Sequence, residues 1–247
     1  MEGSVSEDMG NLSLFDAHAH LNWFEDPAEA AARSQELGVS ALCCTVSPEE
    51  YKQARALLSK CPNVRVAAGL HPWFVDEATD ADDASEAIGG SAWVGEVGLD
   101  FGAKHAYTKK DQLRVFEAIC EACSDGGKTL SLHSVRSAGA VLDVLEKTGA
   151  IDTCRCVFHW FSGTTEELAR AKAAGCWFSV GERMLGTRRG REYARQIPTS
   201  KLLLETDLPE AKNDGSPATT IAESLSRAAE ALMSIKEDWK PSRARLF

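Results

Sequence analysis

Hydrophobic and polar positions follow one another along the chain in a regular order. Short apolar runs of strand length alternate with longer segments in which apolar residues recur at the helical period. The predicted strands cover residues 13–17, 41–46, 64–70, 92–99, 129–133, 155–160, 176–180 and 202–205. The predicted helices cover residues 27–37, 49–60, 82–88, 111–124, 138–147, 165–174, 189–196 and 218–236. Eight such alternations in 247 residues predict an α/β protein built as a (β/α)8 barrel.

Turn and cap signals support these boundaries. Asp26-Pro27 and Ser47-Pro48 are typical helix starts, and Gly38 stands where the first helix should end. Two Rossmann-like halves are the competing architecture, but no G-x-G-x-x-G motif follows the first strand. No linker or internal repeat divides the chain. We therefore expect a disordered tail over residues 1–10 and one barrel domain over residues 11–247.

Composition narrows the class of protein. A net charge of −10 argues against a broad surface that coats nucleic acid, although a local site whose charge comes from metal ions stays compatible with it. The eight cysteines are scattered through strand-like and helical segments, which is typical of reduced thiols. No apolar run reaches the length of a membrane span, and the first residues are polar and acidic, unlike a signal peptide. We expect a cytoplasmic protein that does not bind membranes.

The first predicted strand ends in Asp16-Ala17-His18-Ala19-His20. Residues i, i+2 and i+4 of a strand face one side, so these three polar side chains are expected to point the same way. Two imidazoles held close together are a ready ligand pair for a divalent metal, and a neighbouring carboxylate can orient one ring. The alternative is a strand whose two histidines are simply hydrogen-bonded in the core.

Other predicted strands also end in potential ligands. Five of the six histidines stand at strand ends, and only His105 lies elsewhere, in a polar loop. The further candidates are His71, Glu96, Asp100, His133, His159, Glu205 and Asp207. Function in this type of barrel sits at the C-terminal ends of the strands. Histidines and carboxylates that converge there predict a metal centre with enough ligands for two ions.

Several blocks of sequence, in order, resemble the TatD-type metal-dependent hydrolases, often called TatD DNases, of the amidohydrolase-like superfamily. The blocks read FDAHAHL, GLHPW, VGEVGLDF, SLHSVRSA, VFHWFSG and IPTSKLLLETDLP, and the similarity runs from about Leu14 to the C-terminus. The resemblance implies a metal-dependent nuclease that commonly removes nucleotides from a 3′ end of DNA, with RNA or other esters as substrates of some relatives. It also implies that one ion is held by His18, His20 and Asp207, and the other by His133 and His159, with Glu96 bridging both.

Two ions about 3.5–4 Å apart can share a carboxylate such as Glu96, activate a water and neutralise the oxygens of a phosphodiester. Asp207, at the end of the last strand, is placed to take the proton of that water as well as to ligate; the alternative is that it only ligates. We expect Asp16 and Glu205 to support the ligands, and His71 to contact a phosphate or a leaving group. The mixed ligand set is compatible with Mg²⁺, Mn²⁺ and Zn²⁺.

Three tryptophans, Trp23, Trp73 and Trp160, follow candidate ligands or phosphate contacts closely. At the mouth of the barrel their indoles can stack on bases, which is worth roughly 1–3 kcal/mol per base. The alternative is that they pack beneath the loops, as we expect of Trp93 and Trp177 inside strands.

Arginines follow the fifth and seventh predicted strands. Arg136 comes one residue later than the family pattern His-x-Arg places it, and we expect it to reach a phosphate. The segment 183–191 holds four arginines in an otherwise acidic chain. Barrels often bind phosphate after the seventh strand, so Arg188 and Arg189 are predicted to contact the substrate backbone. A solvated charged face is the alternative.

The segment after Pro209 is shorter than in the resembling family, with one predicted helix in place of two. This end is a candidate surface for a protein partner, and short TatD-like chains also occur as subunits of bacterial anti-phage defence assemblies. We predict a two-metal phosphodiester hydrolase, a 3′–5′ deoxyribonuclease on single-stranded DNA. The alternatives are a metallohydrolase of RNA or of another small ester or amide, and a scaffold subunit, against which the intact ligand set argues.

Overall fold

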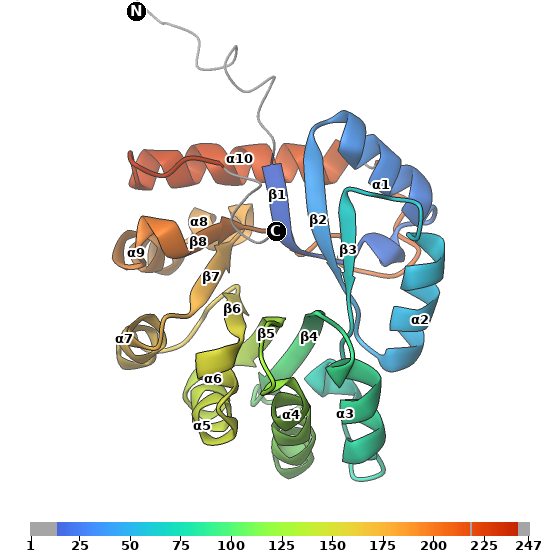
Figure 1. Ribbon diagram of the computed structural model, residues 1–247. Helices are drawn as coiled ribbons and strands as arrows, with labels where there is room; N and C mark the ends of the chain where they lie inside the picture. The colour runs from blue at the N-terminus through green and yellow to red at the C-terminus, as the bar shows by residue number, and fades with distance from the viewer. Residues whose placement is uncertain (1–13, 218, 242–247) are drawn as a thin grey trace, which may run out of the picture.

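The computed structural model describes residues 14–217 and 219–241, so the expected tail over residues 1–10 lies outside the described part. Within that part the strands are β1 (Leu14–Ala19), β2 (Val39–Cys44), β3 (Val64–Ala67), β4 (Trp93–Asp100), β5 (Thr129–Val135), β6 (Arg155–His159), β7 (Trp177–Val180) and β8 (Leu202–Leu204). They pair in parallel in the order β3-β2-β1-β8-β7-β6-β5-β4. The outermost strands meet where the Ala68 N–H donates to the Trp93 carbonyl at 2.9 Å. The sheet is therefore a nearly closed barrel (Figure 1), which confirms the predicted fold.

Helices connect the strands and lie outside the barrel (Figure 1). The α-helices of the described part are α1 (Pro27–Glu36), α2 (Pro48–Leu57), α3 (Ala81–Gly89), α4 (Lys109–Cys123), α5 (Ala138–Thr148), α6 (Ala150–Thr153), α7 (Thr165–Ala173), α8 (Glu182–Gly186), α9 (Arg188–Gln196) and α10 (Thr219–Ile235). The 3-10 helices are η2 (Leu21–Trp23), η3 (Pro72–Phe74), η4 (Ala106–Thr108) and η5 (Thr199–Lys201). The sequence pattern predicts neither α6 nor α8, because helices this short show no full hydrophobic period.

The predicted cap signals act as expected. The Asp26 carboxylate accepts the Glu29 N–H at 2.9 Å, and the Ser47 hydroxyl accepts the Glu50 N–H at 3.2 Å. Each side chain satisfies a backbone donor that the first turn of a helix leaves unpaired. Gly38 has a φ of 76°, the left-handed conformation that ends a helix at low cost, and β2 begins directly after it. β2 therefore starts and ends two residues earlier than the predicted 41–46.

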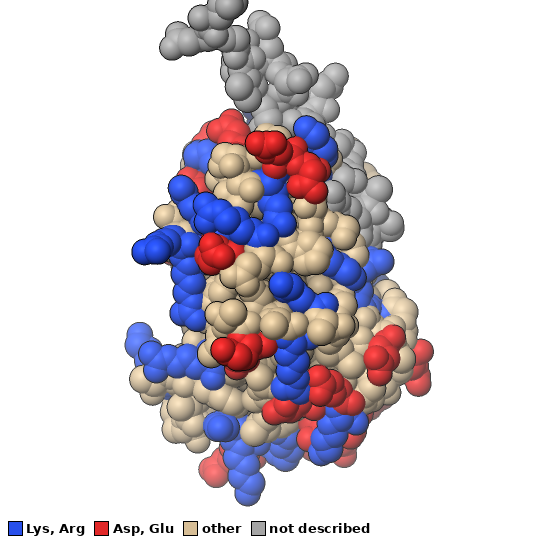
Figure 2. All heavy atoms as spheres, turned by 90° about the vertical axis from the view of Figure 1, so that its left-hand side faces the viewer, with Lys and Arg blue, Asp and Glu red and all other residues tan. Residues whose placement is uncertain are grey.

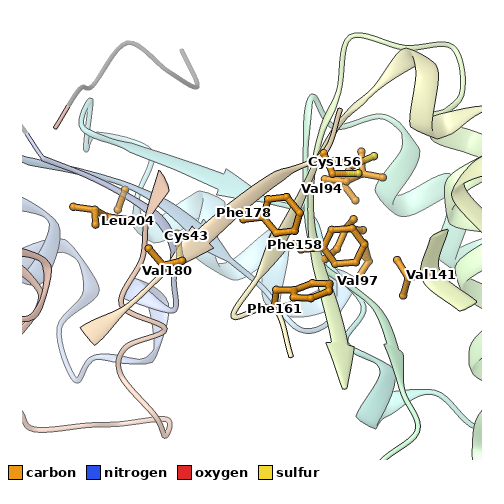
Figure 3. Packing of buried hydrophobic residues seen from close by; sticks show 14 of the residues in the cluster. Cys43, Val94, Val97, Val141, Cys156, Phe158, Phe161, Phe178, Val180 and Leu204 are labelled. Atoms are coloured by element: carbon orange, nitrogen blue, oxygen red, sulfur yellow. The ribbon is translucent and has the colours of Figure 1, made fainter. Parts of the chain in front are cut away.

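Apolar residues fill both sides of the barrel wall. Outward-facing side chains such as Phe158 and Phe178 pack against the helix layer, where Val141 lies on α5 (Figure 3). A second cluster contains strand residues alone and fills the interior: Phe15, Ala17, Leu42, Cys44, Ala67, Val157 and Leu203. Trp93 and Trp177 pack against this inner cluster, as predicted for tryptophans inside strands. The C-terminal strand ends thus lie above a packed apolar interior.

The strand that carries the His-x-His pair is irregular. The register of β1 against β2 shifts between Asp16 and Ala19, and such bulges re-aim side chains beside active sites. The Asp16 carboxylate accepts a hydrogen bond from the Thr206 hydroxyl at 2.6 Å, whereas the His18 ring lies 2.7 Å from the Ser131 hydroxyl on β5. The regular alternation predicted for this stretch is therefore interrupted, and Asp16 does not share the environment of His18.

Glu96 is placed by a close approach of three segments. The pairing of β4 shifts register between Val94 and Val97, and the Glu96 N–H donates to the Thr45 carbonyl at 2.9 Å. Gly69 lies at the same junction, where a Cβ would come within 1.9 Å of the Thr45 oxygen and 2.4 Å of the Glu96 nitrogen. Only glycine fits there, and its lack of a side chain lets Glu96 occupy the centre of the mouth.

The C-terminal part of the described chain completes the wall. α10 packs against α1, α8 and α9 and against β1 and β8. Its buried face carries Ile221, Leu225, Ala228 and Leu232. Beyond it, Trp239 is buried and its indole donates to the Leu202 carbonyl at 3.3 Å. One long helix followed by a tryptophan thus covers the β8–β1 side of the barrel.

Candidate metal centre

The Glu96 carboxylate lies in the middle of the cluster that the strand ends form. Its Oε1 is 2.6 Å from Nδ1 of His133, 2.8 Å from Nε2 of His159 and 3.2 Å from Nε2 of His71. The facing nitrogens of His133 and His159 are 3.5 Å apart. These three imidazoles come from β5, from β6 and from the loop after β3. One carboxylate oxygen therefore faces ring nitrogens from three segments.

The other Glu96 oxygen faces the pair on β1. Oε2 is 3.3 Å from Nε2 of His18 and 3.6 Å from Nε2 of His20. Asp207, in the loop after β8, brings its Oδ1 to 3.7 Å and 3.4 Å from the same two nitrogens. Its backbone N–H donates to the His18 carbonyl at 2.8 Å, and its φ of 57° turns the carboxylate inward. The structure thus gathers all six residues of the expected ligand set at one mouth.

Hydrogen bonds at the back of the rings select their tautomers. Nδ1 of His20 lies 3.0 Å from the Cys44 carbonyl, which only accepts, so Nδ1 carries the hydrogen. Nε2 of His133 lies 3.2 Å from the Asp100 carboxylate. A carboxylate also only accepts hydrogen bonds, so Nε2 carries the hydrogen. In both rings the other nitrogen would give its lone pair to an ion once the hydrogen that it shares with Glu96 or Asp207 is released. A hydrogen bond of this kind is the usual way in which a protein orients a metal-binding imidazole.

His71 has the opposite arrangement. The backbone N–H of Trp73 donates to Nδ1 of His71 at 3.2 Å, so the lone pair of that nitrogen is used. In the neutral ring the hydrogen is then on Nε2, which points at Oε1 of Glu96. His71 therefore presents a donor to the centre where His20 and His133 would give lone pairs to an ion. This geometry favours the predicted contact to a phosphate or leaving group over a role as ligand.

The carboxylate and the imidazoles of the centre shift one another's pKa values. Burial raises the pKa of Glu96, but the adjacent His71, His159 and His18 outweigh it and hold that pKa well below its ordinary value. Burial lowers the pKa of His159, but Glu96 outweighs this effect and raises it to about 10. Burial, reinforced by the charge of His159, lowers the pKa of His18 to about 4. Glu96 is thus ionised, and a proton on His159 supplies the charge that an entering cation would replace.

The donor set fits divalent cations. Nε2 of His18 is buried and has no hydrogen-bond partner among the described residues, while its Nδ1 lies against Ser131. An imidazole nitrogen that faces two carboxylates without a hydrogen bond is suited to ligate an ion. Three sets of residues each bring one ligand atom per residue within 4.8 Å of the others: His18, His20 and Glu96; His18, His159 and Asp207; His71, Glu96 and His133.

Asp16 supports the centre from behind. Its carboxylate accepts the backbone N–H of Thr206 at 3.0 Å and of His18 at 3.2 Å, in addition to the Thr206 hydroxyl. Burial raises its pKa to about 7. Asp16 therefore ties β1 to the segment that carries Asp207, and it contacts the backbone of one candidate ligand, not its ring.

Glu205 supports the opposite side. Its carboxylate accepts the Trp160 N–H at 2.9 Å and the Ser179 hydroxyl, and its Oε2 is 3.9 Å from Nδ1 of His159. Burial raises the pKa of Glu205 to about 7. The residue joins the ends of β6, β7 and β8 beneath the mouth.

The centre opens into a cavity of about 370 Å³, which we call the central cavity; its walls include Trp23, Trp73, Phe74, Arg183 and Lys212. The Trp23 ring stacks on His20 at 4.2 Å between centroids and 13° between planes. Trp73 is 53% exposed and Phe74 57% exposed. Trp160 instead lines a neighbouring cavity. Trp73 and Phe74 thus expose aromatic surface beside the centre, whereas Trp23 is partly buried against His20.

The predicted arginine contacts lie farther out. Arg136 is exposed just after β5, with a φ of 54°. Arg189, on α9, is held by the Gly163 carbonyl and the Tyr193 hydroxyl, and Arg188 is exposed beside it. Figure 2 shows this flank, where Lys and Arg side chains gather over the side of the barrel that carries α7 and α9. None of these three arginines is among the described residues that line the central cavity, so their contact with a substrate stays a prediction.

Sequence reasoning gave Asp100 no role beyond that of a candidate ligand, and it missed two other residues of the site, Ser131 and Arg183. Asp100 lies four residues after Glu96 in the same block, and Ser131 lies two before His133, so strand periodicity was a usable signal for both. Arg183 lines the central cavity, although the pattern gave no reason to prefer it to the other arginines of segment 183–191.

A (β/α)8 barrel with histidines and carboxylates gathered at its C-terminal strand ends has the arrangement expected of a metal-dependent hydrolase. The family can be named from the sequence as well: the model of the TatD related DNases matches residues 15–242. The chain belongs to this family, and it is a hydrolase that acts on phosphodiester bonds. The resemblance seen in the sequence blocks is confirmed.

Relatives and solved structures agree with this assignment. Proteins named 3′–5′ ssDNA/RNA exonuclease TatD include that of Citrobacter rodentium, 30% identical over 209 residues that cover 79% of this chain and 78% of the relative. That of Dickeya dadantii is 31% identical over 210 residues, covering 79% and 78%. A TatD homologue of Escherichia coli has a TM-score of 0.69 at 22% identity, covering 90% of this chain and 98% of that one. A TatD-family hydrolase of Entamoeba histolytica has a TM-score of 0.73 at 18% identity, covering 92% of each chain.

No helix in residues 14–217 or 219–241 combines the length and the apolar character needed to span a membrane.

Proposed function

We propose that the protein is a 3′–5′ exonuclease of single-stranded DNA that uses two divalent ions held around Glu96. The observation that supports this proposal is that the two Glu96 oxygens face different pairs of imidazoles. Oε1 faces His133 and His159, and Oε2 faces His18 and His20. A carboxylate with one oxygen toward each of two imidazole pairs is arranged to bridge two ions.

The remaining carboxylate, Asp207, completes the pair of ligands on β1. Its Oδ1 lies near both His18 and His20, so it would hold the same ion as they do. Its side chain is 26% exposed, whereas that of Glu96 is 4% exposed. Asp207 is therefore the carboxylate of the centre that a water molecule from the central cavity reaches most easily.

When bound, the ions would supply Lewis acidity, which lowers the pKa of a water and neutralises phosphodiester oxygens. Burial raises the pKa of Asp207, but the hydrogen bond from His20 and the nearby histidines outweigh it and lower that pKa to about 2. Asp207 is therefore ionised at neutral pH and able to accept the proton of the attacking water. His71 presents its Nε2 hydrogen to the same space, where it would donate to a phosphate oxygen or to the departing oxygen.

The choice of a nucleic-acid end as substrate is supported by the walls of the central cavity. Trp73 and Phe74 are more than half exposed beside the metal centre and offer flat faces to unstacked bases. Stacking of this kind requires bases that are free of a duplex, which favours single strands. The relatives from Citrobacter rodentium and Dickeya dadantii are named ssDNA/RNA exonucleases, so RNA is the alternative substrate.

The metal is Mg²⁺, Mn²⁺ or Zn²⁺, since imidazoles and carboxylates accept all three. A reducing compartment such as the cytoplasm suits the chain, because all eight cysteines are free.

The proposal is tested with purified protein and end-labelled single-stranded DNA, double-stranded DNA and RNA. Each substrate is incubated with Mg²⁺, Mn²⁺ or Zn²⁺, and with a chelator. We expect mononucleotides to be released from the 3′ end of single-stranded DNA with at least one metal and not with the chelator. Release from the 5′ end, internal cleavage, or full activity in the chelator would each contradict the proposal. Lys60→Ala, on the far side of the barrel, serves as a control for the preparation.

A further inference from the structure

A second cavity lies beside the central cavity, and three residues, Arg183, Pro209 and Glu210, line both. Its volume is about 320 Å³, and we call it the side cavity. Its walls come from α8, from the first turns of α10 and from the loop after β8. We propose that the side cavity binds the terminal nucleoside of the substrate strand while the adjoining phosphate lies at the metal centre. The inference rests on the proposed function and adds a binding site to it.

The charge of the side cavity suits a group that carries no phosphate. Its titratable lining residues are Glu182, Glu205, Glu210, Asp214, Arg183 and Arg227. Nε of Arg227 lies 2.7 Å from Oε1 of Glu182, and Arg183 pairs with Glu210. Both arginines are thus matched by carboxylates, and the carboxylate of Asp214 remains in addition. A second phosphate would be repelled from such a wall, whereas a sugar and a base would not.

Trp160 gives the side cavity a flat wall. Its backbone N–H donates to the buried Glu205 carboxylate at 2.9 Å, and its φ of 40° fixes the direction in which the indole leaves the chain. The guanidinium carbon of Arg183 lies 6.0 Å from the centre of the indole ring. An indole and a guanidinium plane are both surfaces on which a base of any sequence can stack. Hydroxyls of Ser216, Thr220 and Ser224 complete the lining.

Arg183 stands at the junction of the two cavities and can exchange partners. Its side chain is 51% exposed and that of Glu210 58% exposed, so their ion pair contributes little to stability. Lys212, the other cation of the central cavity, is held by the nearly buried Glu50 at 2.6 Å. A phosphate between the cavities would therefore replace Glu210 as the partner of Arg183. A guanidinium can bind phosphate with two parallel hydrogen bonds, and the exposed ion pair with Glu210 costs little to break.

A cavity of this size and charge accepts one nucleoside and excludes the phosphate of the next. The bound strand must therefore end there, and its last group must be uncharged, as a free 3′-hydroxyl is. This arrangement would restrict the enzyme to removing one nucleotide at a time from a hydroxyl end. A 3′-phosphate would be repelled by the carboxylates of the side cavity.

Binding provides the first test. The metal-supplied protein is titrated in a calorimeter with deoxyadenosine 5′-monophosphate, with deoxyadenosine and with inorganic phosphate. We expect the monophosphate to bind at least about tenfold more tightly than phosphate, because stacking and the phosphate contact combine. Arg183→Ala should weaken the monophosphate about tenfold. Ser216→Trp, which adds an indole to the lining of the side cavity, should reduce its affinity to that of inorganic phosphate. Ser234→Trp, on an exposed position near the end of α10, is the matched control and should change nothing.

Activity provides the second test. Ser216→Trp should slow mononucleotide release from single-stranded DNA at least tenfold while leaving hydrolysis of bis(p-nitrophenyl) phosphate, which has no nucleoside, within about twofold. A strand with a 3′-phosphate should resist the wild-type protein. Equal binding of phosphate and monophosphate, or equal cleavage of 3′-phosphate and 3′-hydroxyl strands, would overturn the side-cavity assignment. If no phosphodiester is hydrolysed but the monophosphate binds and Ser216→Trp abolishes that binding, the proposed function fails and the assignment stands.

Discussion

The indole Nε1 of Trp73 donates a hydrogen bond to Oδ2 of Asp100 at 2.6 Å, and the same oxygen lies 3.2 Å from Nε2 of His133. Trp73 is half exposed at the mouth, whereas Asp100 is buried. One carboxylate therefore connects an aromatic side chain that faces solvent with a ring that faces Glu96. Because Asp100 accepts a hydrogen bond from Nε2 of His133, it keeps the ring hydrogen on that nitrogen and leaves Nδ1 to ligate an ion.

Asp100→Asn should weaken metal binding by about 10- to 100-fold, the usual effect of losing the partner that orients a ligand. The neutral amide cannot enforce the Nε2 tautomer of His133 as the carboxylate does. The measurement is a metal titration followed by calorimetry. Trp73→Phe, which removes the indole donor and keeps the Asp100 carboxylate, is the control and should bind metal almost as the wild type does. An unchanged affinity in Asp100→Asn would show that the ring is oriented by other contacts.

Asp207→Asn should lose far more activity than metal affinity. Asparagine keeps the size and one ligating oxygen but cannot accept a proton, and general-base catalysis is worth about 10²- to 10⁴-fold. We expect a loss in that range at saturating metal. His20→Ala should instead recover much of its activity as metal is raised, because its Nε2 would only hold an ion. A metal titration of both variants, with plateau rate and half-saturation read separately, decides between the roles. A near-normal plateau for Asp207→Asn would make the residue a ligand alone.

His71→Ala should lower the maximal rate and leave metal binding nearly unchanged. The ring presents a hydrogen to the centre, and removal of one such donor commonly costs about 10²- to 10³-fold in rate. The rate constant at saturating substrate and the metal dissociation constant are measured on the same preparation, with His20→Ala for comparison. If His71→Ala weakens metal binding as strongly as His20→Ala does, the ring is a ligand and its tautomer is the reverse of the one inferred here.

The protein should bind close to two divalent ions per chain, and chelation should abolish hydrolysis. Each ion that binds only the folded state stabilises it by about 2.7 kcal/mol at 100 times its dissociation constant. For a chain of this length that corresponds to a rise of roughly 5–10 °C in Tm. Elemental analysis gives the stoichiometry, and thermal unfolding with and without EDTA gives the shift. Saturation at one ion with full activity would exclude the two-metal mechanism.

Paired replacement of Arg188 and Arg191 by alanine should weaken binding of single-stranded DNA and reduce its dependence on salt. Both side chains are exposed on α9, a helix of the flank that Figure 2 shows. Each lost phosphate contact removes about 0.7 from the log–log salt slope for a single strand, so the pair should remove about 1.4. Lys52→Ala with Lys60→Ala, on the other side of the barrel, is the matched control. A slope equal to that of the control would identify the arginines as an ordinary solvated face.

The sequence alone determined the barrel and the strand ends that carry its chemistry. Alternation of apolar runs with amphipathic segments is a local property, and so are the caps at Asp26 and Ser47, which the structure contains where they were expected. The positions of His133 and His159 at the ends of β5 and β6 follow from the same local pattern. Parallel strands then place those ends at one mouth without any further information.

Only the tertiary structure decided what each side chain does there. The bulge in β1 sends Asp16 to Thr206 and His18 to Ser131, and the close approach at Gly69 sets Glu96. The tautomer of His71 depends on the Trp73 backbone, and the position of Arg183 depends on how α8 packs between two cavities. Apart from the local contact between His71 and Trp73, these relations join segments far apart in the chain. A hydrophobic period in the sequence indicates which face of a helix or strand is buried. It does not indicate which partner a polar side chain on that element will contact in the folded protein.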